Sequence, residues 1–210
     1  MTPRCEQILE NGLAAMALPL SSTTQQRLLD YVALLHKWNK AYNLTAVRDP
    51  EQMVSRHVLD SLSIMPWVTG PCLLDIGAGA GLPGLVLAMV NPELQVTLVD
   101  SNGKKVRFQQ HACLALGIDN AVPVHTRIEA FNPPRPFEQI VSRAFSSLTD
   151  FVELSQPFLA QGGEWLAMKG RLDTEDTTLP SGVQAHDSVP LNVPGETGQR
   201  HLVRVRKTAL

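Results

Sequence analysis

LLDIGAGAGLPG, residues 73–84, joins a run of apolar residues to four closely spaced glycines. The apolar run predicts a buried strand, and the glycines predict a tight turn that leads into the next helix. Asp75 adds a carboxylate near the end of that strand. A turn of this kind lets polar groups of a ligand approach the backbone amides at the start of a helix. The segment therefore predicts a binding site for a nucleotide-type cofactor.

From this segment onward the chain alternates between expected strands and expected helices. The strands are expected over residues 72–76, 95–100, 121–125, 138–142 and 164–168. The helices are expected over residues 82–90, 102–116 and 147–160. This alternation predicts an α/β fold with a parallel sheet, right-handed crossovers and helices on both faces.

The two ends of the chain depart from this alternation. Residues 182–191 and 201–206 alternate apolar and polar side chains, which predicts an antiparallel hairpin that completes a seven-stranded sheet. Residues 22–66 carry apolar side chains at helical spacing, with a capping box starting at Ser22 and a second helix start at Asp49-Pro50. We therefore divide the chain into an N-terminal helical region, residues 1–66, and a main domain, residues 67–210.

The composition is that of an ordinary globular protein, with 44% hydrophobic and 18% charged residues. No apolar stretch approaches the ~20 residues that a membrane span needs. The first residues lack the apolar block of a secretory signal, so we expect a cytoplasmic protein, and nothing in the sequence demands more than a monomer. A net charge of −2 does not favour nucleic-acid binding, so an RNA partner would have to meet a local basic patch.

The three cysteines, Cys5, Cys72 and Cys113, are widely spaced and form no CxxC motif or Cys/His cluster. This pattern predicts reduced thiols, and neither a disulfide framework nor a metal site.

The glycine pattern leaves two cofactor classes open. Gly79-x-Gly81-x-x-Gly84 matches the dinucleotide fingerprint, and Asp100 follows at the distance that this fingerprint expects. Asp75 favours S-adenosylmethionine instead, because a carboxylate attracts the ammonium of a methionine moiety, directly or through water, and repels a pyrophosphate. Asp100 suits the ribose hydroxyls of either cofactor, and capping of a turn or helix is the alternative role for both carboxylates.

Several short sequence motifs follow one another along nearly the whole chain, and the glycine-rich segment is one of them. They are HKWNKAYNLT (36–45), RHVLDS (56–61), DIGAGAGLPG (75–84), DS (100–101), SRA (142–144), MKG (168–170) and RH (200–201). Together they resemble the glucose-inhibited division protein B family, which is the small-subunit ribosomal RNA methyltransferase G family. Ala78 and Ala80 stand where that family often has Thr and Pro, and both changes keep the turn small.

The resemblance implies a Rossmann-like class I methyltransferase fold and S-adenosylmethionine as cofactor. It also implies the target: N7 of a guanine (position 527) in the 530 loop of 16S rRNA in the small ribosomal subunit. Gly77 and Leu82 would line the methionine and ribose part of the pocket, Ile128 and Glu129 would meet the adenine, and Arg143 would lie beside the reacting centre. The expected cofactor site is completed by Asp75, Gly79 and Asp100.

Guanine N7 carries a free lone pair at neutral pH, so we expect no catalytic base. We expect Arg143 and Lys169, the candidate catalytic residues, to hold the O6 face or the phosphate of the guanine, and Phe145 to offer a stacking surface. All three follow expected strand ends, where open sheets bind ligands. The alternatives are a core position for Phe145, a solvated strand end for Lys169, and structural roles for His57 and His201.

Seven cations form a candidate basic rim for RNA: Lys37, Lys40, Arg48, Arg56, Lys104, Lys105 and Arg107. Scattered solvated charges are the alternative. Three other functions stay open at this point: a methyltransferase acting on a small molecule or protein, a nucleotide-binding protein without catalysis, and a nicotinamide enzyme.

Overall fold

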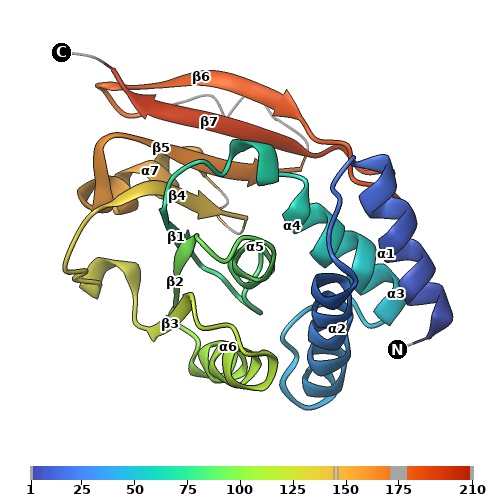
Figure 1. Ribbon diagram of the computed structural model, residues 1–210. Coiled ribbons are helices and arrows are strands. Elements are labelled where there is room, and N and C mark those ends of the chain that lie inside the picture. Colours follow the sequence, from blue (N-terminus) through green and yellow to red (C-terminus); the bar gives the residue numbers. More distant parts are fainter. Residues whose placement is uncertain (1, 144, 146, 171–178, 209–210) are drawn as a thin grey trace.

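The computed structural model describes residues 2–143, 145, 147–170 and 179–208. Ala144 of the SRA block lies outside the described residues. The strands form a seven-stranded sheet in the order β3-β2-β1-β4-β5-β7-β6 (Figure 1). They are β1 (Cys72–Ile76), β2 (Gln95–Asp100), β3 (Ala121–His125), β4 (Phe137–Ser142), β5 (Leu159–Lys169), β6 (Val183–Pro190) and β7 (His201–Lys207).

The five strands β3-β2-β1-β4-β5 are parallel, and β7 runs antiparallel to both β5 and β6. The expected mostly parallel sheet with an antiparallel C-terminal hairpin is confirmed. The chain leaves β1 for β2 and β3 on one side and returns to β4 on the other side. Because the strand order reverses between β1 and β4, the carboxyl ends of these strands border the crevice in which open sheets bind ligands.

Helices cover both faces of the sheet. They are α1 (Pro3–Ala15), α2 (Ser22–Tyr42), α3 (Pro50–Met53), α4 (Asp60–Leu62), α5 (Gly84–Val90), α6 (Gly103–Leu116) and α7 (Leu148–Ser155). Leu73 of β1 packs in one core cluster with α2, α5 and α6, whereas Leu74 and Ile76 pack in a second cluster with α7. Helices on both faces bury all five residues of β1, including Asp75.

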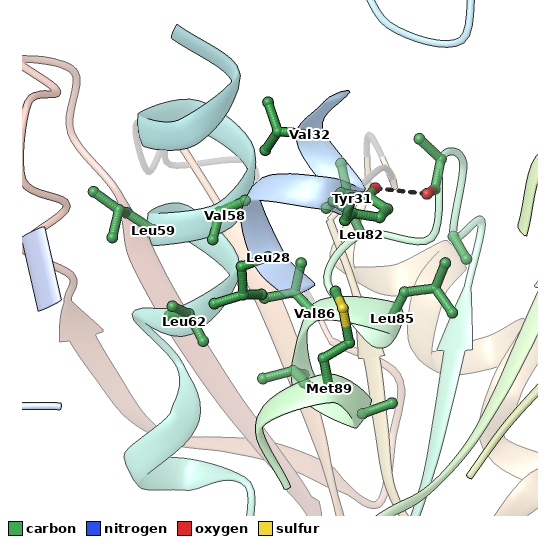
Figure 2. Close-up of a cluster of buried hydrophobic side chains, with 14 of the residues drawn as sticks. Leu28, Tyr31, Val32, Val58, Leu59, Leu62, Leu82, Leu85, Val86 and Met89 are labelled. Atoms are coloured by element: carbon green, nitrogen blue, oxygen red, sulfur yellow. Dashed lines mark hydrogen bonds between the residues drawn. The ribbon is translucent and has the colours of Figure 1, made fainter. Parts of the chain in front are cut away.

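The N-terminal helices share the first core cluster with the main domain. Figure 2 shows Leu28 of α2 between Val58 and Val86 of α5, in a core cluster that also contains Val32 and Met89. The boundary that we drew between residues 66 and 67 therefore marks a change in element type, and one apolar core continues across it. This packing brings α2 against the turn that follows β1.

The structure differs from the sequence-based expectations at several element ends. Within the expected helical region we assigned no particular helix before residue 22, but Cys5, Leu9 and Leu13 form a narrow buried stripe along α1, with Thr2 as its N-cap. The cap of α2 is Ser21, whose hydroxyl accepts from the Thr24 N–H, so the expected capping box is displaced by one residue.

The second predicted N-terminal helix contains a π-helical segment, Val54–Leu59, between α3 and α4. One-turn π segments inside helices are frequent at functional sites, because they redirect side chains and release backbone carbonyls. This segment carries Arg56 and His57. Both residues lie at the candidate site described below.

Candidate functional site

Three adjoining hollows lie along the carboxyl edge of the sheet. Hollow A, of about 370 Å³, is lined by residues that include Gly77, Asp100, Lys105, Ile128, Glu129 and Phe145. Hollow B, of about 160 Å³, is lined by residues that include Leu44, Thr45, Gly77, Gly79, Leu82, Lys105 and Arg143. Hollow C, of about 310 Å³, is lined by residues that include Arg56, His57, Asp60, Arg143, Lys169 and Arg200.

The three hollows form a row because neighbouring hollows share residues. Gly77 and Lys105 line both A and B, and Arg143 lines both B and C. Every residue of the expected cofactor site except Asp75 lines hollow A or hollow B. The two candidate catalytic residues, Arg143 and Lys169, both line hollow C.

Asp75 is fully buried and caps a helix. Its Oδ2 accepts a 2.8 Å hydrogen bond from the Gly84 N–H at the start of α5. A Cβ at position 84 would lie 2.7 Å from this oxygen, so only glycine fits there. This geometry realises the capping alternative for Asp75. The other oxygen, Oδ1, has no hydrogen-bond partner among the described residues.

Burial raises the pKa of the Asp75 carboxyl to about 7, opposed by the Gly84 hydrogen bond and the charge of Arg143. An unpartnered carboxylate oxygen in an apolar surrounding is costly. A nearby positive charge or a bridging water would therefore stabilise the Asp75 carboxylate. This leaves the water-mediated form of the expected ammonium contact open.

Most amides of the glycine turn are already bonded within the protein and are not free to meet a ligand, which corrects our first expectation. Six backbone N–H groups of the turn donate to protein acceptors: those of Gly77, Ala78, Gly79, Gly81, Leu82 and Gly84. A pyrophosphate site needs such N–H groups directed at the ligand. The occupied amides therefore weigh against a dinucleotide.

Asp100 sits at the end of β2 and lines hollow A. Oδ2 accepts from the Gly79 N–H and Oδ1 from the Asn102 N–H, each at 2.8 Å. The Lys105 ammonium lies 3.9 Å from Oδ2. Because each carboxylate oxygen has further lone-pair capacity, Asp100 can also accept hydrogen bonds from ligand hydroxyls.

Two buried side chains that we did not identify from the sequence hold the turn from behind. The Tyr31 hydroxyl of α2 donates a 2.7 Å hydrogen bond to the Ala80 carbonyl (Figure 2). Gln109 Nε2 of α6 donates a 2.8 Å hydrogen bond to the Gly79 carbonyl. Tyr31 has the helical spacing of a core residue, so its sequence context hides this polar contact.

We expect Tyr31→Phe to weaken cofactor binding by about 3- to 10-fold, because the variant leaves the buried Ala80 carbonyl without its donor and loosens the turn. Turnover at saturating cofactor should stay within about 2-fold, since the ring volume is kept. Calorimetry with S-adenosylmethionine and steady-state kinetics would separate the two effects. Unchanged cofactor affinity in a folded variant would contradict a positioning role for Tyr31.

Hollow C contains a buried carboxylate between two arginines. Asp60 Oδ2 lies 3.1 Å from Arg143 Nη1, and Asp60 Oδ1 lies 3.1 Å from Arg200 Nε. Arg143 Nη1 also donates to the Arg56 carbonyl at 3.2 Å. Glu196 adds a 3.2 Å ion pair with Arg56. These contacts fix the arginines in place around the hollow.

Four of the ten residues that line hollow C are cationic hydrogen-bond donors: Arg56, Arg143, Lys169 and Arg200. Arg and Lys present only N–H donors, so this hollow suits a target rich in acceptors, such as a phosphate or the O6/N7 edge of guanine.

His57 is held as a neutral, structural side chain. Burial and the nearby Arg143 charge lower the pKa of His57 to about 4. Its Nδ1 lies 3.0 Å from the Arg56 carbonyl and must donate to it, so its Nε2, 2.9 Å from Thr45 Oγ1, accepts from that hydroxyl. His201 likewise bonds through Nδ1 to the Gly170 carbonyl, at 2.8 Å. Both ring nitrogens of His57 are therefore engaged, and it is not available as a base.

Lys169 and Phe145 lie in different parts of the site. Lys169 lines hollow C, and its ammonium donates to the Phe145 carbonyl at 3.2 Å. The Phe145 ring instead lines hollow A and packs against the Phe151 ring, with 5.5 Å between their centroids. The contact with Phe151 fits the core alternative for Phe145, and stacking on a guanine stays a prediction.

Asp60, Glu196 and Arg200 had no assigned role in the sequence analysis. Asp60 and Arg200 do belong to the RHVLDS and RH blocks, but 140 positions separate them, and only the fold brings them together. Within the described ranges, no group of three or more His, Cys, Asp or Glu side chains is arranged to hold a metal ion. In the same part of the chain, no helix is both long and apolar enough to cross a membrane.

Comparison with known proteins confirms the resemblance inferred from the motif blocks. The model of the GidB family, described as rRNA small subunit methyltransferase G, matches residues 24–203. The chain is 59% identical over 208 residues to ribosomal RNA small subunit methyltransferase G of Chromohalobacter salexigens, covering 99% of this chain and 100% of the relative. It is 56% identical over 200 residues to the protein of the same name from Marinobacter nauticus, covering 95% and 94%.

Solved structures support the fold class. TrmN from Thermus thermophilus aligns with a TM-score of 0.58 and 17% identity, over 74% of this chain and 53% of that chain. The glycopeptide N-methyltransferase MtfA, crystallised with S-adenosylmethionine, aligns with a TM-score of 0.56 and 12% identity, over 73% and 88%. At these identities the likeness concerns the fold alone, and it confirms the expected Rossmann-like methyltransferase architecture.

Proposed function

The chain belongs to the rRNA small subunit methyltransferase G family, and from this premise we propose that it methylates N7 of a guanine in the 530 loop of 16S rRNA. It is an S-adenosylmethionine-dependent rRNA methyltransferase. The observation that carries the residue-level proposal is the row of three hollows, in which Arg143 lines both B and C. A methyl donor bound in hollows A and B and a guanine bound in hollow C would meet at this arginine.

The residues of hollows A and B fit S-adenosylmethionine. Asp100 in hollow A presents acceptors for ribose hydroxyls, and Ile128 and Glu129 border the same hollow for the adenine. In hollow B six amides of the turn already donate to protein acceptors, and the buried Asp75 carboxyl behind the turn favours a cationic methionine group. S-adenosylmethionine, when bound, supplies a methyl group on a positively charged sulfur.

The residues of hollow C fit a guanine in its RNA backbone. Arg143 and Lys169 would hold the O6 face or the phosphate, and the Asp60 carboxylate keeps Arg143 and Arg200 aimed at the hollow. The guanine N7 lone pair needs no base, and the engaged nitrogens of His57 agree with this requirement. The role of these residues is alignment, and well-oriented reactants can gain roughly 7–11 kcal/mol in favourable cases.

We further propose that the chain acts as a monomer. The proposed substrate also implies a cytoplasmic location, where small ribosomal subunits are assembled.

The test maps the methylated nucleotide on 16S rRNA from cells with and without the protein. We expect one N7-methylguanine in the 530 loop that disappears on deletion and returns with the purified protein and radiolabelled cofactor. Label transferred to a metabolite or a protein, with no change in the rRNA, would contradict the proposal. Cofactor binding with no transfer to any of these would indicate a binding protein without catalysis.

A further inference from the structure

Positive charge is concentrated in two short stretches of an otherwise acidic chain. Residues 31–48 and 101–118 together hold six of the 18 Lys and Arg residues and none of the 20 Asp and Glu residues. The six cations are Lys37, Lys40, Arg48, Lys104, Lys105 and Arg107. Five of these side chains are exposed, and Lys105 is half-buried. The net charge of −2 conceals this segregation.

The fold places these two stretches side by side. The first covers the C-terminal part of α2, and the second covers α6, which lies next to α2 (Figure 1). Arg27, near the start of α2, donates to the carbonyls of Leu116 and Gly117 at the end of α6. Trp38, later in α2, contacts Phe108 within α6. The helices are therefore antiparallel, and the C-terminal end of α2 lies beside the N-terminal end of α6.

Aromatic rings gather between the two helices. The Trp38 ring lies 5.1 Å from the Tyr42 ring and 5.0 Å from the His111 ring, each with an interplanar angle of 33°. Tyr42 is 38% exposed, which is unusual for a large apolar side chain in this structure. On α6, Lys104 and Arg107 precede His111 at helical spacing, so cations and rings share one stripe.

This surface adjoins the methyl-donor site. Leu44 and Thr45, two and three residues after Tyr42, line hollow B. Lys105, next to Lys104, lines hollows A and B. A strand of RNA lying across α2 and α6 would therefore reach the position where the methyl group is transferred.

We propose that α2 and α6 form the docking surface for the unpaired RNA that flanks the target guanine. Tyr42, supported by Trp38, offers a ring for a neighbouring base, and Lys104 and Arg107 hold backbone phosphates. Proteins that bind single-stranded nucleic acid combine these two features, since stacking tolerates any base and cations follow the backbone. The proposal rests on the proposed rRNA substrate and assigns a place on the chain where that substrate binds.

Charge reversal tests the electrostatic part. We expect Lys104→Glu/Arg107→Glu to lower kcat/KM for methylation of unmodified small subunits by about 10- to 100-fold and to flatten its salt dependence, because two phosphate contacts are lost. Calorimetry should show unchanged S-adenosylmethionine affinity. The matched control is Arg4→Glu/Lys207→Glu, two exposed cations on α1 and β7, which should stay within about 2-fold. Equal losses in both double variants would overturn the assignment of this surface.

Truncation of the exposed ring tests the stacking part. We expect Tyr42→Ala to lower kcat/KM for the small subunit by about 10-fold, in the range found for loss of base–aromatic stacking. Tyr42→Phe should stay near wild type, because it keeps the ring. Val122→Ala, which removes an exposed apolar side chain on β3, outside α2 and α6, should have no effect. Wild-type kinetics for Tyr42→Ala would overturn the stacking role.

These outcomes are distinguishable from failure of the proposed function. If the wild-type protein does not methylate the small subunit, the substrate assignment fails. If the wild-type protein methylates it and the α2 and α6 variants do so equally well, only the docking surface fails. Thermal unfolding of each variant shows whether a loss of activity reflects a loss of folding.

Discussion

Replacement of Arg143 by alanine is expected to lower kcat/KM for methylation of small ribosomal subunits by about 10²- to 10³-fold. Arg143 lines both the donor hollow and the cationic hollow C, so it touches both reactants in the proposed complex. Misplacement of a reacting group by about 1 Å can cost about 10²-fold, and loss of a charged contact adds to this. S-adenosylmethionine affinity should fall much less, by about 2- to 5-fold, because hollow A is untouched.

The structure predicts that the Arg143→Ala protein stays folded. Asp60 keeps its 3.1 Å contact to Arg200, so the buried carboxylate is not left without a partner. Arg143→Lys is the matched control: it keeps the charge but cannot reach Asp60 and the Arg56 carbonyl with one planar group, so we expect an intermediate loss. Single-turnover methyl transfer and calorimetry provide the two readouts. Normal turnover and normal RNA affinity in Arg143→Ala would show that the assignment is wrong.

The strands and helices of the main domain could be predicted because local pattern and tertiary environment agree there. β1, β2 and β3 match their expected ranges. β1 is buried along its whole length, and β3, although it is the edge strand, is marked by its β-branched valines. The observed ends of strands and helices differ from the predicted ends where contacts with neighbouring elements determine them. β5 extends back to Leu159 because it continues pairing along β4 past a register shift at Phe137/Gln139. The expected helix 147–160 ends at Ser155, before the Pro157 turn.

The site could be predicted only in part, and the reason is again physical. Residues that follow strand ends, such as Asp100, Ile128 and Arg143, are brought together by the topology, which the sequence pattern specifies. The Asp60 pairing with Arg143 and Arg200 and the Tyr31 contact to Ala80 depend on how distant segments pack. The sequence shows which N–H groups the glycine turn contains. It does not show which acceptors bond to them, because that depends on the fold.

The second large effect is expected at Asp75, where function and stability oppose each other. The pKa of this buried carboxyl is about 7 in the folded protein, above its ordinary value of 3.8. A raised carboxyl pKa makes stability fall as pH rises between these two values, because the unfolded chain ionises first. The corresponding loss is on the order of 4 kcal/mol at pH 8. Asp75→Asn should remove this loss, since an amide oxygen can still accept from the Gly84 N–H.

We therefore expect the difference in free energy of unfolding between Asp75→Asn and wild type to grow from near zero at pH 4 to a few kcal/mol in favour of the variant at pH 8. Urea unfolding across this pH range measures it, and a constant difference would contradict the assignment of the raised pKa. S-adenosylmethionine affinity at pH 7.5 should change in the opposite direction, with a loss of about 10-fold, because the variant lacks the charge that attracts the methionine ammonium. A stabilised variant with wild-type S-adenosylmethionine affinity would mean that Asp75 only caps a helix and does not attract the cofactor. A stabilised variant with weakened binding would mean that the chain retains a destabilising buried charge because the cofactor needs it.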